Sequence, residues 1–550
     1  MLFTFIGFIT AINGQKILKE TTFDPDGKAK ISNLSEVQVD EANNQMTLFY
    51  LTKSTNKKVK AEILYFDLEF NFIRAESVEE DVDRMREKYH LKFSLNFCPE
   101  TKEPLLSVEA NLFTGQTTFK KGYIENYYNW STGYCDNRFN VEEKVKPKGE
   151  DGERLKLVNY WTNNDLQQYV RSTTYNAYSY GYARTNRSVH ASKNVMDADK
   201  GDVVIFAFVK EKGMAKESIG KHYVFEKFSV QTMEKTKSTK LDFPVATVPL
   251  NYKFLSNGNI AYLFQRADAK YEYVEVDFNG EILKRLEYAV PNENMWIVND
   301  FSEDGENLYI YGVTSKVKMN AKSITNFAYS AQTFMSATAI YADKPNGYQL
   351  MKINTQKIEW VSTTTVKDFA TTFVNIGKEK GKPFTGGKLS VGELHISPNG
   401  SIMLTGQKKN AKNEMLEVVA FDFSSTGKLI ANYSTKLRKR NDYNKLTPTK
   451  HALMNAADGS GVYWSIFEVA GAKKSGLFSG ENGAVRILYY PRVTKIANDG
   501  KSATDFVEIG NGEFFLDDNF PINVLKDNKF IFIGADKSGK KMWFSKVKFD

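Results

Sequence analysis

The stretch SEDGENLYIYG at residues 302–312 decides the fold. It begins as a turn rich in acidic residues and glycine and continues as a strand of alternating apolar and aromatic side chains. Gly305 suits the positive φ that such a turn needs, and the turn reverses the chain between antiparallel strands. The same pattern recurs at 41–51, 197–208, 255–265, 397–406, 457–466 and 525–535, and more weakly at 103–113.

A second pattern follows several of these strands. It reads as a strand, a turn and another strand, as in ILYFDLEFNFIRAE at 63–76, YVEVDFNGEILKRL at 273–286 and VVAFDFSSTGKLIAN at 418–432. Asp67, Asp277 and Asp422 are interpreted as equivalent residues before this turn. One unit then holds four antiparallel strands, which is the composition of a propeller blade.

The number of repeats indicates a single toroidal β-propeller over residues 15–550. Eight strand starts can be counted, at Leu48, Leu105, Val203, Ile260, Leu308, Ile402, Val462 and Phe530. Eight blades are therefore favoured, with seven as the alternative because the unit at Leu105 is weak. The last hairpin is too short for a whole blade, so we expect the N-terminal segment QKILKETTFD to complete it and close the ring.

The stretches FSEDGENLYIYG and ISPNGSIMLTG resemble the SPDG-plus-strand repeat of TolB-like (WD40-like) β-propellers. The resemblance covers most of the chain loosely. It implies a toroidal all-β fold that binds something on one face, and it brings no catalytic residue with it.

The first fourteen residues have the length of a signal peptide. Leu2 to Ile12 is an unbroken run of apolar and small residues, too short to span a bilayer, although no basic residue precedes it. A buried first strand is the alternative. The start resembles that of exported proteins of Bacteroidota, so we expect an exported protein of the periplasm or outer membrane. Cys98 and Cys135 could pair in such a compartment or remain two thiols.

Composition excludes several classes of protein. Among 550 residues, 41% are hydrophobic and 25% charged, enough apolar material for a large core. The net charge of +8 comes mostly from lysines spread along the chain, so nucleic acid is not expected as a partner. The sequence lacks GxSxG, HExxH, P-loop and Rossmann motifs, and we expect no metal and no cofactor. Asp300, Ser302 and Asp304 with Gly305 match only the first half of a calcium loop.

Insertions into the repeats are the candidate sites of function, because rigid scaffolds display functional loops. They are expected near 77–92, 125–195, 314–342 and 365–394, with a short amphipathic helix over 77–90. The candidate partner-binding residues are Tyr175, Tyr178, Tyr180, Tyr182, Arg184 and Arg187 in one insertion, and Phe327, Phe334 and Met335 in another. The basic run KLRKRNDYNK at 436–445 could meet an acidic partner or lipid headgroups, or form a solvated loop.

These observations favour a non-enzymatic binding or scaffold subunit that engages a membrane-associated protein through its inserted loops. The alternative is a carbohydrate-active enzyme or glycan-binding module that uses the propeller channel.

Overall fold

A computed structural model gives the fold of the chain. It describes residues 15–25, 34–54, 58–81, 95–97, 104–106, 109–110, 119–129, 134–145, 154–162, 202–210, 220–229, 235–277, 279–291, 294–329, 345–379, 381–438, 442–456, 458–474, 485–510, 512–517, 521–527 and 529–549.

The described chain is all-β with few helices. It contains five antiparallel four-stranded units, of which the last four follow one another directly along the chain and the last has a short parallel strand added. Their strands are β2 (Leu34–Asp40), β3 (Gln45–Ser54), β4 (Lys58–Asp67) and β5 (Phe72–Asp81); β11 (Arg154–Thr162), β12 (Asp202–Lys210), β13 (His222–Ser229) and β14 (Lys235–Asp242); β15 (Thr247–Phe254), β16 (Ile260–Arg266), β17 (Lys270–Val276) and β18 (Ile282–Ala289); β19 (Asn294–Asp304), β20 (Asn307–Lys318), β21 (Pro345–Ile353) and β22 (Ile358–Thr365); and β24 (Lys388–Ile396), β25 (Ile402–Lys409), β26 (Met415–Phe423) and β27 (Leu429–Thr435) with β23 (Phe373–Asn375).

The remaining strands form smaller and larger sheets. A nine-stranded sheet holds β28 (Lys450–Asn455), β29 (Gly461–Lys474), β30 (Val485–Ala497), β31 (Val507–Glu508), β32 (Phe514–Leu516), β33 (Ile522–Val524), β34 (Lys529–Asp536), β35 (Met542–Phe549) and β1 (Gln15–Phe23). Two small sheets hold β6 (Leu95–Phe97) with β7 (Pro104–Leu106), and β8 (Glu109–Ala110) with β9 (Phe119–Asn129) and β10 (Tyr134–Val145). The described helices are α3 (Ala321–Tyr329), α5 (Val366–Thr371) and α6 (Asp442–Leu446).

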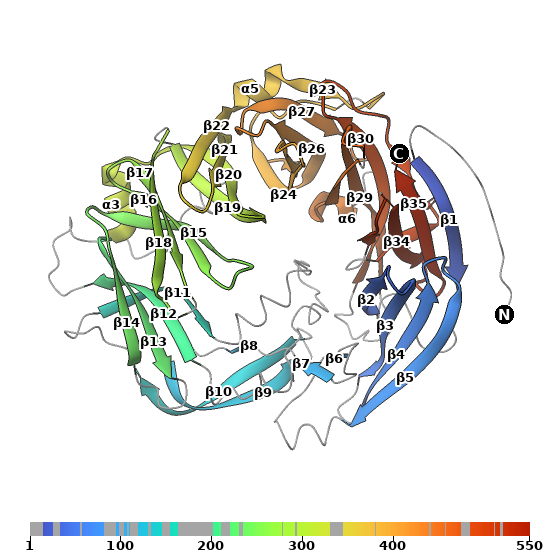
Figure 1. Cartoon of the computed structure of the whole chain (residues 1–550), viewed down its shortest axis with the longest axis horizontal. Helices are drawn as coiled ribbons and strands as arrows, with labels where there is room; N and C mark the ends of the chain where they lie inside the picture. The colour runs from blue at the N-terminus through green and yellow to red at the C-terminus, as the bar shows by residue number, and fades with distance from the viewer. Residues whose placement is uncertain are drawn as a thin grey trace.

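The sheets follow one another in chain order around a common centre, an arrangement consistent with a β-propeller (Figure 1). In three consecutive sheets the first strand, β15, β19 or β24, lies on the inner side of the arc. Each four-stranded sheet has two ends. We call the end with the first-to-second and third-to-fourth connections the turn end. We call the end with the second-to-third connections and the passage to the next sheet the hairpin end.

The turns at the turn end adopt the conformation that the repeat predicts. Gly258, Gly305, Gly400 and Gly459 have φ between 57° and 86°. A backbone hydrogen bond closes equivalent turns, from Leu255 N to Asn259 O at 2.8 Å and from Ser397 N to Ser401 O at 2.9 Å. The glycines therefore have the left-handed backbone role that the sequence indicated.

One alignment within the repeat is wrong. Asp67 and Asp277 do occupy one position, since each carboxylate accepts N–H bonds from the turn that follows it. At the corresponding turn between β26 and β27 Ser424 takes this place, and its N–H binds Lys428 O. Asp422 lies two residues earlier, inside β26, opposite Met403 and Ala431. A shift of two residues keeps a side chain on the same face of a strand, so the apolar alternation did not reveal the error.

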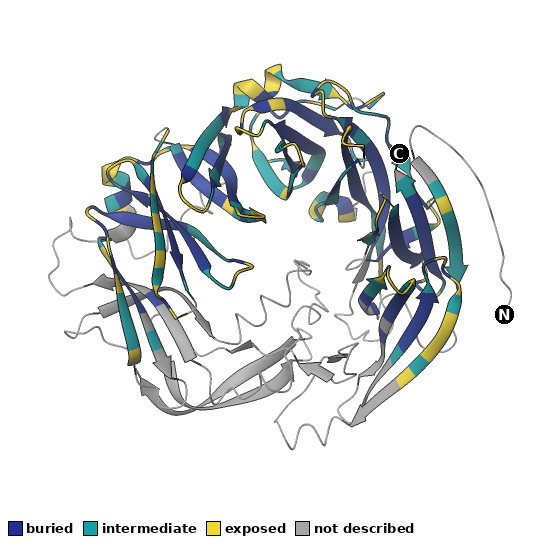
Figure 2. Cartoon of the chain, in the orientation of Figure 1, coloured by how far each residue is buried: buried dark blue, intermediate teal, exposed yellow. Residues whose placement is uncertain are grey.

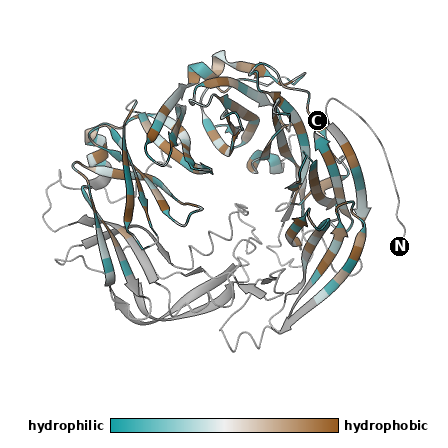
Figure 3. Cartoon of the chain, viewed as in Figure 1, coloured by the Kyte–Doolittle hydropathy of each residue, from teal (hydrophilic) through white to brown (hydrophobic). Residues whose placement is uncertain are grey.

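The core lies between consecutive sheets. Where the burial of side chains is described, the strands are buried in their middle and exposed at turns and outer edges (Figure 2), and apolar residues alternate with polar ones along them (Figure 3). One continuous cluster joins side chains from β12 through β27. Trp296, Trp464 and Trp543 are among the largest fully buried side chains.

The first and last described strands meet in one sheet. β1 pairs with β35 over its whole length, and the Trp543 indole N–H donates to Glu20 at 2.5 Å. The last strands also contact the first sheet, because the Tyr50 hydroxyl binds Met542 Sδ at 3.3 Å and the Lys546 ammonium binds Glu69 at 2.6 Å. Side chains of β2–β5 and of β34–β35 share one apolar cluster.

The expected insertions overlap regular strands. Residues 77–81 belong to β5, so the predicted helix over 77–90 is wrong where the structure describes it, and 82–90 lie outside the described residues. The strand is favoured because residues 77–80 pair in register with β4. Parts of 125–195 form β9, β10 and β11, and the start of 314–342 extends β20.

Candidate functional site

Most of the predicted partner-binding residues lie outside the described residues. This holds for the four tyrosines and two arginines between 175 and 187, and for Phe334 and Met335. Phe327 falls within α3, although its side chain is not among those described. The structure therefore does not test these contacts.

The connections that carry these residues leave opposite ends of the sheets. The segment with the tyrosines joins β11 to β12, a first-to-second connection at the turn end. The segment with Phe334 and Met335 joins β20 to β21 at the hairpin end. The two segments therefore begin and end at opposite ends of their sheets.

The start of the second segment packs on this protein itself. α3 follows Asn320, whose side-chain oxygen accepts the Ser323 N–H at 3.0 Å, as an N-cap residue does. Ile324 on this helix is buried in the main apolar cluster, and the helix contacts β15 and β16. The helix is thus anchored to the neighbouring sheet.

Polar side chains join the inner strands of consecutive sheets. The Lys253 ammonium on β15 donates to Asp300 Oδ1 at 3.1 Å and to Phe301 O at 2.6 Å on β19. His395 on β24 lies 2.9 Å from Asn455 Oδ1 on β28. Burial lowers the pKa of His395, which favours the neutral ring. The polar groups of Lys253 and His395 therefore form contacts between adjacent sheets.

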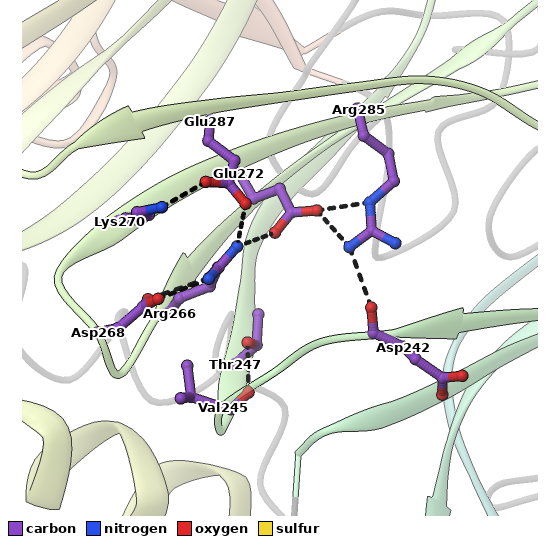
Figure 4. A network of polar contacts seen from close by, with 9 residues as sticks. All are labelled: Asp242, Val245, Thr247, Arg266, Asp268, Lys270, Glu272, Arg285 and Glu287. Atoms are coloured by element: carbon purple, nitrogen blue, oxygen red, sulfur yellow. Dashed lines mark hydrogen bonds and ion pairs between the residues drawn. The ribbon is translucent and has the colours of Figure 1, made fainter.

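A buried ion network occupies the hairpin end of β15–β18 (Figure 4). The Arg266 guanidinium is 4% exposed and donates to Glu272 at 2.9 Å, to Asp268 at 2.5 and 3.0 Å, and to Glu287. Burial opposes the charge of Arg266, but the hydrogen bonds from these carboxylates outweigh it and raise the pKa. Alternating charges in RADAKYE at 266–272 were the available sequence signal, and the repeat analysis did not use it.

The network also reaches the preceding sheet. Arg285 on β18 donates to Glu272 at 2.6 Å and to the Asp242 carbonyl at the end of β14 at 3.0 Å. The Lys270 ammonium donates a hydrogen bond to Glu287 at 2.5 Å. This bond lowers the pKa of Glu287, although burial acts in the opposite direction. A fully paired network of this kind fixes the relative position of two sheets.

A second buried ion pair lies in β29 and β30. Arg492 is fully buried, 3.1 Å from Glu468 and 3.3 Å from Glu379, and its guanidinium faces the Phe506 ring at 4.7 Å. Burial lowers the pKa of Arg492 and the charge of Glu468 acts against this. Glu379 precedes β24, so this pair also spans consecutive sheets.

Asp422 differs from all of these acids. It is 5% exposed, and no other described residue forms a hydrogen bond or ion pair with its carboxylate. It lies on the face of β26 that packs against the following sheet, near Tyr433. Burial alone raises the pKa of Asp422 to about 7.

The described side chains do not form a recognisable catalytic or metal centre. No group of three histidine, cysteine or acidic side chains suited to a metal ion occurs within the described ranges. Asp300, Ser302 and Asp304 lie on the strand β19, and Asp300 is paired with Lys253, so they do not form the loop of a calcium site. No helix in the described part of the chain has the length and apolarity needed to cross a membrane.

Comparisons with known proteins give little further guidance. No known protein family matches the chain, and no curated protein matches it in sequence. Among solved structures it is similar to a GH43 β-1,3-galactosidase, with TM-score 0.24 and 8% identity over 96% of this chain and 95% of the other. It is also similar to a lignostilbene dioxygenase of Pseudomonas brassicacearum (TM-score 0.26, 8% identity, 64% and 84% of the two chains) and to a variant of Synechocystis apocarotenoid oxygenase (0.24, 9%, 85% and 89%). At this level of similarity no activity is transferred to this chain.

Proposed function

We propose that this protein is an eight-bladed β-propeller that acts as a binding or scaffold subunit. In this proposal it is exported to the periplasm or outer membrane and engages a membrane-associated protein through the segments inserted between its strands.

The closed ring is supported by the contacts between the two ends of the chain. β1 completes the sheet of β34 and β35, and that sheet packs against β2–β5, as the sheets from β12 to β27 pack against one another. A closed ring has no free sheet edge, which suits a rigid platform for inserted segments.

The observation that carries the functional proposal is that the buried Arg266 and Arg492 are both held in ion pairs with neighbouring carboxylates. The Arg266 and Arg492 networks are paired within a sheet and across to the next one, so these groups serve the scaffold. Recognition is then assigned to the long connections, of which 163–201 leaves the turn end and 319–344 the hairpin end.

The test is a pull-down with the tagged protein from detergent-solubilised membranes of its own host. Two deletion variants, lacking 175–190 and 330–342, are compared with the full chain; the second leaves α3 in place. The proposal expects one stoichiometric membrane protein that is lost in one variant and kept in the other. A monomer without any stoichiometric partner would contradict the proposal and would direct the next screen to glycan binding and hydrolysis.

A further inference from the structure

Three segments at the hairpin end hold a large excess of positive charge. Residues 381–388, 408–414 and the described part of 436–450 (436–438 and 442–450) together carry nine basic and two acidic side chains, a net charge of +7 against +8 for the whole chain. The other 523 residues sum to a net charge of +1. We call these three segments the basic face.

The three segments are adjacent in the structure. The Lys408 ammonium binds Pro383 O at 3.4 Å, and the Gln407 side chain accepts the Thr449 N–H at 2.8 Å. Lys388 donates to Asn413 at 2.9 Å. All these contacts lie at the hairpin end of β24–β26 or in the passage from β27 to β28.

Several of these charges have no acidic partner. Lys382, Lys412 and Lys436 are exposed, and no described carboxylate forms a salt bridge with them. Lys408 and Arg438 are paired, with Glu417 and Glu508 respectively. The excess is therefore presented to whatever lies against this face.

The excess positive charge of the basic face brings two lysines, Lys409 and Lys388, into a repulsive cross-strand pair. Lys409 is half-buried and stands directly opposite Lys388 in the β24–β25 pairing, and like charges in such a pair repel each other. Burial, and then the charge of Lys388, lowers the pKa of Lys409. An anion between the two ammonium groups would remove this repulsion.

Exposed apolar side chains lie within the same face. Leu446, at the end of α6, is 73% exposed and is the most exposed large apolar side chain in the described part of the chain. Tyr443, one turn earlier, is 48% exposed. A soluble polyanion would gain nothing from Leu446, whereas a bilayer accepts such a side chain between headgroups whose phosphates meet the lysines.

We propose that the basic face docks on an anionic lipid bilayer, with its lysines on the headgroup phosphates and Leu446 inserted at the interface. This inference does not depend on the protein partner proposed above. It concerns lipid, and it is tested with purified protein in the absence of any membrane protein.

The experiment measures co-sedimentation of the full chain with vesicles of phosphatidylcholine alone or mixed with phosphatidylglycerol. The variant Lys382→Glu/Lys412→Glu reverses two charges of the basic face. Its matched control, Lys428→Glu/Lys501→Glu, makes the same change in net charge at exposed lysines of the turn end. Leu446→Asp tests insertion, and thermal unfolding verifies that each variant is folded.

Binding is expected only to the anionic vesicles and is expected to weaken with salt. Each lysine lost from the basic face should weaken binding roughly fivefold, and Leu446→Asp roughly tenfold or more, with the control close to wild type. Three results would each overturn the proposal: no binding to anionic vesicles, an equal loss in the control, or binding that Leu446→Asp leaves unchanged. If Leu446→Asp binds the vesicles like wild type and dextran sulfate displaces the protein from them completely, the basic face would be assigned to a soluble polyanion.

Discussion

The replacement Asp422→Asn is expected to stabilise the protein by an amount that grows between pH 4 and about pH 7 and then stays constant. The carboxyl group is buried at 5% exposure, and burial raises its pKa from 3.8 to about 7. Asn has nearly the same shape but cannot ionise, so the substitution removes the cost of a buried charge and leaves the packing against Met403 and Ala431 in place.

The magnitude and the sign follow from the two pKa values. A shift of about 3 units corresponds to about 4 kcal/mol. Because the folded-state pKa is raised, the favourable contribution of Asp422 is fully present below pH 3.8 and is lost as the pH rises through about 7. The advantage of the Asn variant should therefore be near zero at pH 4, grow by about 1.4 kcal/mol per pH unit, and level off above pH 7.

The assay is equilibrium urea unfolding of both proteins, followed by far-UV circular dichroism between about pH 5 and pH 8. The control is Asp527→Asn, a side chain that is 76% exposed in a turn, for which a change below about 0.5 kcal/mol is expected. If the free energies of unfolding of wild type and Asp422→Asn run parallel over this pH range, the carboxyl group is not buried as described and the reasoning is refuted.

Three further predictions concern the scaffold. Arg266→Met should lower the free energy of unfolding by about 3–5 kcal/mol, because the buried Glu272 then keeps only Arg285 as a cationic partner. The double variant Arg266→Met/Glu272→Gln should recover part of this loss in thermal melts, and no recovery would argue against the ion network. Deletion of residues 15–23 should expose the edge of β35, lower the melting temperature and promote aggregation in light scattering, and an unchanged melt would argue against the β1–β35 pairing. Gly427→Ala should lower the free energy of unfolding more than Gly459→Ala, although both glycines have positive φ. A Cβ atom at residue 427 would lie 2.6 Å from the Trp360 ring, whereas none of the described atoms lies within 4 Å of a Cβ atom at residue 459. Equal losses in urea unfolding would refute this packing.

The repeat made much of the fold predictable. Each turn needs a residue that tolerates positive φ, and each following strand alternates between two buried or half-buried faces, so both leave a local signal in the sequence. The strand starts at Leu48, Ile260 and Ile402 accordingly fall in β3, β16 and β25, at the same place in their sheets. The N-terminal segment was expected to complete the last hairpin, and β1 does pair with β35, whereas closure of the ring and the number of blades stay proposals.

Other features left no such signal. Asp422 and Asp277 look equivalent in sequence because a slip of two residues preserves the alternation, and only the backbone hydrogen bonds show that Asp422 lies in a strand and Asp277 in the turn. The segment from Ser77 to Glu80 has the letters of a helix start, but cross-strand pairing with β4 outweighs that local preference.

The all-β class, the repeat and its turns can be read from the amino-acid sequence, because these depend on local backbone preferences and on the period of the apolar side chains. Only the tertiary structure decided which charges face one another. Arg266 and Glu272 could be seen as neighbours in one hairpin, but Arg492 and Glu379 are 113 residues apart, and so are brought together only by packing of successive sheets. The same is true of the basic face, whose three segments are separate in sequence and meet because strand direction places all of them at one end.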